Sequence, residues 1–156
     1  MSGAVVTKVK GLEEAKKAVR SLAESIKNPD DKLMRRLGDA MLEDTARRFM
    51  TRGYGTWKPN APSTIKRKGH SNVLIHTGAM MASTQTVVQG NKVTLTVPYG
   101  GKNKSADVPP KHQHGAPHIP QRKIVAVTPQ LLERLNIAAK DWVKDLVLAF
   151  GKKMTK

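Results

Sequence analysis

The chain contains no cysteine, so neither a disulfide nor a thiolate metal site can form. Aromatic side chains are also scarce, with two each of Trp, Tyr and Phe in 156 residues, so the core must be mainly aliphatic. No apolar run approaches the roughly 20 residues of a membrane span, and the first residues lack the apolar stretch of a signal peptide. We therefore expect a soluble protein with no membrane partner.

Acidic residues are nearly absent from the middle of the chain. Residues 51–127 hold 11 Lys and Arg but only one acid, Asp107, whereas the two flanking regions mix both signs. The whole chain has a formal net charge of +16. A basic segment of this kind favours an anionic partner, either DNA or an acidic protein surface. A solvated basic face with no partner is the other interpretation.

Three long stretches carry apolar side chains at intervals of three and four residues, the pattern of an amphipathic helix. The predicted helices cover residues 12–27, 29–50 and 129–150. Only Asn28 and its neighbours separate the first two, with Asn28 as the expected N-cap of the second. We therefore expect these two helices to pack as an antiparallel N-terminal hairpin.

The region between the second and third helices has shorter elements. We predict a short helix, a helical turn, a β-hairpin turning at Gly90-Asn91, a long basic loop and a returning strand, over residues 63–68, 77–81, 84–97, 99–122 and 123–127. The predicted class is α+β: the N-terminal helical hairpin, a small antiparallel sheet with the β-hairpin and the basic loop, and the C-terminal helix packed on that sheet. Residues 1–156 are expected to form one domain, with flexible tails at 1–10 and 152–156.

Residues that could perform catalysis are few. His112, His114 and His118 lie within seven residues, and a His-x-His pair can chelate a metal. Asp107 is the only acid near them, however, and a hydrolytic metal site usually recruits a carboxylate. No serine has a Gly-x-Ser-x-Gly context, and no phosphate-binding Gly-rich loop is present. We expect no enzyme, no metal and no cofactor, and rank a histidine-based metal hydrolase last.

Two groups of basic residues suit contact with phosphates or with an acidic partner. They are Lys66, Arg67 and Lys68 in the short helix, and Lys102, Lys104 and Lys111 in the loop. No recognition helix or set of stacking aromatics accompanies them, so any DNA contact should be independent of sequence. A sequence-independent DNA-binding protein is thus the alternative function, and a solvated helix end is the alternative interpretation of Lys66–Lys68.

Several short motifs occur in a fixed order along the chain. They are Trp57-Lys58-Pro59, then Thr64 and basic residues to Lys68, then Leu74 before Thr77-Gly78-Ala79-Met80, then Tyr99, then His112-Gln113-His114-Gly115, then Ile119-Pro120-Gln121-Arg122. In this order they resemble the phage virion morphogenesis (tail completion) family over roughly residues 33–150. One departure is the stretch from Gly100 to Lys111, which separates Tyr99 from the histidine motif. We expect this insertion to reach the DNA or an acidic neighbour.

The resemblance implies a non-catalytic structural protein of a tailed bacteriophage, made in the host cytoplasm and located in the virion neck or the head-proximal end of the tail. It implies a homo-oligomeric ring, a hexamer or dodecamer, around the DNA channel, with other neck and tail proteins and genomic DNA as partners. Conformational and contact roles then fall on Trp57, Pro59, Thr64, Thr77, Gly78, Met80, Tyr99, His112, Gln113, Gly115, Ile119, Pro120 and Arg122. Gly78 and Gly115 suit turns that other residues resist, and Pro120 suits an extended path.

Overall fold

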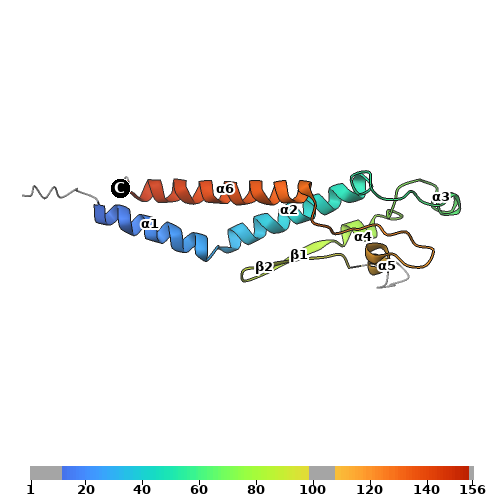
Figure 1. Cartoon of the computed structure of the whole chain (residues 1–156), viewed down its shortest axis with the longest axis horizontal. Coiled ribbons are helices and arrows are strands. Elements are labelled where there is room, and N and C mark those ends of the chain that lie inside the picture. Colours follow the sequence, from blue (N-terminus) through green and yellow to red (C-terminus); the bar gives the residue numbers. More distant parts are fainter. Residues whose placement is uncertain (1–11, 99–107, 155–156) are drawn as a thin grey trace, which may run out of the picture.

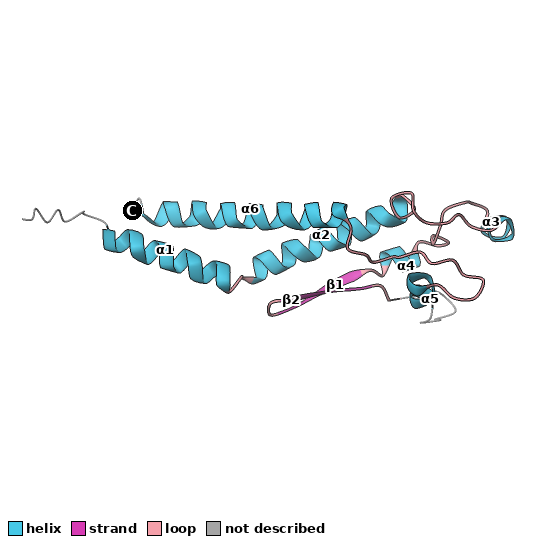
Figure 2. Cartoon of the chain, viewed as in Figure 1, coloured by secondary structure: helices cyan, strands magenta, loops and turns pink. Residues whose placement is uncertain are grey.

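The computed structural model describes residues 12–98 and 108–154, so Tyr99, Lys102, Lys104 and the first predicted tail lie outside the described residues. The elements are α1 (Leu12–Lys27), α2 (Asp31–Met50), α3 (Pro62–Lys68), α4 (Ala79–Ala82), β1 (Gln85–Gln89), β2 (Lys92–Thr96), α5 (Val108–His114) and α6 (Pro129–Met154). Figures 1 and 2 show long helices beside one small antiparallel sheet. The predicted α+β class is confirmed.

The two N-terminal helices do not form the expected hairpin. They follow one another end to end with a bend, and α6 runs back along both of them (Figure 1). The N-cap of α2 is Asp30 instead of Asn28, and its extended backbone (φ −80°, ψ 169°) directs the chain onward. The Asp30 carboxylate accepts hydrogen bonds from Leu33 N at 3.0 Å and from Trp142 Nε1 at 2.9 Å. The bend is therefore fixed against α6, which covers only part of the apolar faces that a hairpin would have paired, because Val19 and Ile26 of α1 stay exposed.

Helix α2 is the central layer. It contacts both strands of the sheet and also α6. Helix α6 was predicted to pack on the sheet, but it packs on α2 and α1. Gly38 allows the close approach of the hairpin, because a Cβ there would lie 3.0 Å from Thr86 Oγ1 and 3.5 Å from Val93 Cγ1. The sheet thus packs on α2, in place of the C-terminal helix that was predicted to cover it.

The predicted β-hairpin is confirmed, with β1 and β2 antiparallel and Val88 opposite Val93. The predicted long loop at 99–122 is partly wrong, because residues 108–114 in its middle form α5. Pro109 and Pro110 lie in the first turn of α5, where missing N–H groups cost nothing. Residues 123–127 form no strand; their backbone is bonded by side chains instead, as described below.

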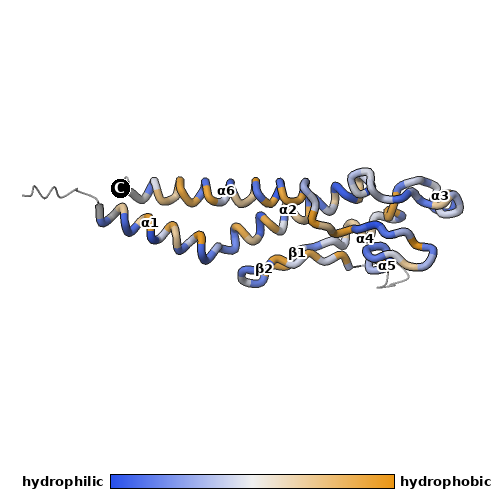
Figure 3. The backbone as a smooth tube through the Cα atoms, in the orientation of Figure 1, coloured by the Kyte–Doolittle hydropathy of each residue, from blue (hydrophilic) through white to orange (hydrophobic). Residues whose placement is uncertain are grey.

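A compact core closes the end of α2. Phe49 and Trp57 pack edge to face with ring centroids 5.8 Å apart, and Val73, Met80 and Ile124 complete the cluster. Figure 3 shows hydrophobic positions along α6, while α3 and its neighbouring loops are mainly hydrophilic. This core holds the segments that form the site.

Candidate functional site: a basic groove

A groove of about 1310 Å³ is lined by residues of α3, α5 and their neighbouring segments. Figure 1 shows these elements at the end of the molecule far from the C-terminal end of α6. The walls of the groove are α3 and the segment before it, the segment leading into α4, parts of α5 and residues 118–122. We call it the basic groove after the cations that line it, Lys58, Arg67, Lys68 and Arg122. Of the predicted site residues it brings together Pro59, Thr64, Thr77, Gly78, Met80, His112, Ile119, Pro120 and Arg122.

Arg122 joins three segments of the groove and is only 5% exposed. Its Nε donates to Lys58 O and its Nη2 to Pro59 O, both at 3.0 Å, and its backbone N–H donates to His112 O at 2.7 Å. Burial lowers the pKa of its guanidinium from the ordinary value. Among the described residues, no ion pair with a carboxylate accompanies these bonds. Arg122 therefore places a buried and uncompensated positive charge at the wall of the groove.

His112 is neutral in this setting. Burial, and then the nearby charge of Arg122, lowers the pKa of His112 from 6.5 to about 4. Arg122 Nη1 lies 3.4 Å from His112 Nδ1, and because a guanidinium only donates, Nδ1 must be the acceptor. The ring proton then resides on Nε2.

The depressed pKa of His112 makes stability depend on pH. The unfolded chain binds a proton at His112 below pH 6.5 and the folded chain does not until about pH 4, so stability falls as the pH falls through this window. Between pH 7.5 and pH 5 we expect His112 to account for about 1–2 kcal/mol of the loss, allowing for its partial exposure. Urea unfolding measures the free energy of unfolding at the two pH values. The difference between the two values should be smaller for His112→Gln than for the wild type. The exposed His114→Gln is the control, and an unchanged difference in His112→Gln would contradict the assignment.

No acid among the described residues of the lining balances the remaining cations of the groove. Burial, then Arg122 and Arg67, lower the pKa of Lys68, whose Nζ donates to Asn72 O at 2.6 Å. No Asp or Glu is found among the described residues that line the groove. Positive groups are thus held close enough to disfavour one another's charge, which an anionic ligand would relieve.

Two bulky residues of the groove have backbone conformations that favour glycine. Leu74 has φ 58° and His118 has φ 63°, and both line the groove. Such conformations cost about 1–2 kcal/mol per residue and gather at functional sites. Gly78 (φ 80°) and Gly115 (φ 82°) adopt the turns predicted for them.

Other motif residues hold the groove in place from outside it. Trp57 Nε1 donates to Lys123 O at 3.2 Å. The amide of Gln113 pairs with the backbone of Val125, donating to its O at 2.7 Å and accepting from its N at 3.0 Å. Lys66 and Lys111 are exposed but do not line the groove. The motif thus combines residues of the groove with residues that fix its wall.

A buried polar network that was not predicted from the sequence lies behind this wall. Arg48, 4% exposed, donates from Nε to Ile124 O at 3.1 Å and from Nη2 to Lys123 O at 2.5 Å. Tyr54 packs under the Arg48 guanidinium, and its hydroxyl donates to Asp44 Oδ1 at 2.6 Å. The sequence did contain an indication of this network. Asp44 and Arg48 are four residues apart, and each directly precedes a residue of the apolar stripe predicted for this helix, Thr45 and Phe49.

Two other features carry no site. The described residues contain no group of three or more His, Asp or Glu side chains placed to hold a metal, so His112, His114 and His118 are not brought together as ligands.

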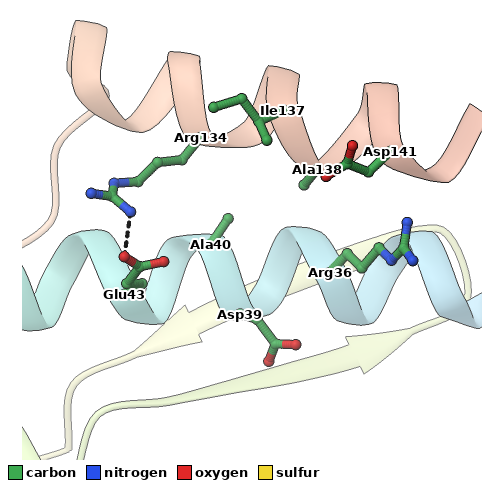
Figure 4. A pocket seen from close by; sticks show the side chains of 8 residues that line it. All are labelled: Arg36, Asp39, Ala40, Glu43, Arg134, Ile137, Ala138 and Asp141. Atoms are coloured by element: carbon green, nitrogen blue, oxygen red, sulfur yellow. Dashed lines mark ion pairs between the residues drawn. The ribbon is translucent and has the colours of Figure 1, made fainter. Parts of the chain in front are cut away.

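A smaller hollow of about 420 Å³ lies between α2 and α6 (Figure 4). There Arg134 is paired with Glu43 at 2.5 Å, and charges of both signs face one another. We interpret this hollow as a helix–helix contact.

Within the described residues, every helix is too short or too polar to cross a membrane. Fold and site together define a small α+β protein built around one basic groove. The model of the phage virion morphogenesis family matches residues 11–144. The chain therefore belongs to the phage virion morphogenesis family, which gives it a structural role in building a phage particle. No curated protein and no solved structure matches the chain.

Proposed function

We propose that this protein acts at the head–tail junction of a tailed bacteriophage, where it completes the tail or neck and joins the tail to the head. The observation that carries this proposal is the gathering of the family motif into one basic groove at one end of an elongated chain. A protein that joins two structures needs a surface for another component, and this groove is such a surface. The protein would be located in the neck or at the head-proximal end of the tail.

The long helices support a ring of copies. Val19 and Ile26 on α1 and Val143 and Val147 on α6 are 38–66% exposed, although they belong to amphipathic helices. Apolar surface on the helices of each copy suits head-to-tail contacts with neighbouring copies, which form a ring where the rotation between copies closes, and such contacts leave the basic groove free for another component. In our proposal the ring is a hexamer or dodecamer around the DNA channel and contacts other neck and tail proteins.

Electron microscopy of a phage that carries an early stop codon in this gene tests the proposed role. We expect DNA-filled heads beside separate or malformed tails, because the joining component is missing. A plasmid copy of the wild-type gene should restore joined particles. Normal, infectious particles without the protein would contradict the proposal.

The cations of the groove also favour a second candidate, a sequence-independent DNA-binding protein. That function requires binding to free duplex DNA with an affinity that falls steeply with salt. The two candidates therefore differ in what the basic groove binds.

A further inference from the structure

We propose that the basic groove binds an extended peptide segment that carries both carboxylates and apolar side chains, contributed by another protein of the virion. The inference rests on the proposed function only for the source of the peptide. Four features of the groove indicate this ligand: its uncompensated cations, its apolar lining, its size and shape, and its strained rim.

The cations of the groove favour an anionic ligand. Lys58 and Arg67 are exposed and Lys68 and Arg122 are half-buried or buried, so the groove offers positive charge at several depths. The described lining contains no carboxylate that would compete for them. At separations of a few ångströms such charges attract an anion strongly even near the surface.

The apolar lining favours a peptide over nucleic acid. Leu74, Met80, Val108 and Ile119 line the same groove as the cations and are at least half-buried. A phosphate backbone has no apolar side chains to place against them, whereas an acidic peptide does. Single-stranded nucleic acid would use stacking aromatics, and the described lining contains no Trp, Tyr or Phe.

The size and shape point to a chain segment. A volume of about 1310 Å³ exceeds the roughly 300–1,000 Å³ of small-molecule sites. Duplex DNA is itself convex and is usually read by a protruding helix or β-ribbon. A concave groove instead admits a narrow ligand, such as one extended peptide.

The backbone of the groove is already held in a conformation that costs energy. Leu74 and His118 keep positive φ angles on its walls, and the turn at His118 is closed by two backbone hydrogen bonds between Ala116 and Ile119, at 3.1 and 2.8 Å. Arg122 separately fixes the segment before α3 through its bonds to Lys58 O and Pro59 O. Strain held by surrounding hydrogen bonds is typical of a pre-organised binding site. The groove therefore needs little rearrangement to accept a peptide, which favours affinity.

A peptide array tests the proposal. Overlapping 15-residue peptides that tile the other structural proteins of the same phage are probed with the full-length protein. We expect the bound peptides to combine Asp or Glu with apolar residues. The variant Lys58→Glu/Arg67→Glu should bind them at least about tenfold more weakly, because two exposed charges of the groove are reversed.

The control is Lys140→Glu/Lys144→Glu on α6, which changes the net charge equally at exposed positions away from the groove. It should bind the same peptides as the wild type, and circular dichroism should show that both variants are folded. A 30-base-pair duplex is tested in parallel by gel shift at low salt.

Two results would overturn the proposal: no peptide whose binding depends on Lys58 and Arg67, or duplex binding that depends on them while peptide binding does not. The second result would make the groove a DNA site. The peptide array and the stop-codon phage test the groove assignment and the junction role separately. Separate heads and tails in the stop-codon phage together with a negative array would remove only the groove assignment, and joined particles with a positive array would remove only the junction role.

Discussion

Replacing Arg48 with methionine should lower the free energy of unfolding by about 2–4 kcal/mol. The side chain is 4% exposed, and it supplies the hydrogen bond to Ile124 O and one of two to Lys123 O. Methionine fills similar space but donates nothing, so the buried carbonyl of Ile124 loses its partner. Loss of the contact with the Tyr54 ring adds to the cost. Urea unfolding followed by circular dichroism measures the change.

Arg47→Met is the matched control for Arg48→Met. Arg47 is the preceding residue of α2 and is exposed, and within the described residues its side chain makes only a 3.5 Å ion pair with Glu43. Such a pair contributes at most about 0.5 kcal/mol. Equal destabilisation by the two variants would show that the bonds from Arg48 to residues 123 and 124 do not hold the wall of the groove.

Gly53→Ala should be among the most destabilising small substitutions in the chain, at about 3 kcal/mol or more. A Cβ at Gly53 would lie 2.4 Å from Trp57 Cδ1 and Nε1, so the ring must move. Movement of the ring would disturb its packing on Phe49 and its hydrogen bond to Lys123 O. Residue 53 also has φ +67°, which disfavours any side chain. Thermal unfolding and Trp fluorescence together should show a lower Tm and an altered Trp57 environment.

Gly55→Ala separates the two causes. Gly55 has φ +82° but nothing lies within 4 Å of the position of its Cβ. The substitution therefore carries the backbone cost alone, about 1–2 kcal/mol. If Gly53→Ala were no worse than Gly55→Ala, close packing of Trp57 over Gly53 would be excluded.

Local patterns along the chain predicted the elements well. Apolar spacing located α1, α2 and α6, alternation around Gly90-Asn91 gave the hairpin, and Thr128 caps α6 with a 3.1 Å bond to Leu131 N. The packing of those elements was harder to predict. The bend after α1 depends on the bond from Trp142 to Asp30, which joins residues 112 positions apart. The spacing of residues within one element does not predict a contact between residues so far apart in the sequence.

The site was predictable in composition and not in shape. Motif order singled out His112 and Arg122, and charge counting singled out Arg67 and Lys68, but nothing in their spacing places them around one groove. The pKa of His112 depends on burial beside Arg122, which follows only from the fold. Arg48 was missed because an arginine in an amphipathic helix ordinarily faces solvent.

The bonding of residues 122–125 determines how a mechanical load would travel through the protein. Arg122 lies in the wall of the groove, and the carbonyls that follow it are bonded to Arg48 of α2 and to Trp57. Helix α2 is in turn packed along α6. A pull on a ligand held at Arg122 would therefore pass into the two longest helices without crossing the two-stranded sheet. Deformation of the sheet would then leave this path from Arg122 to the helices intact.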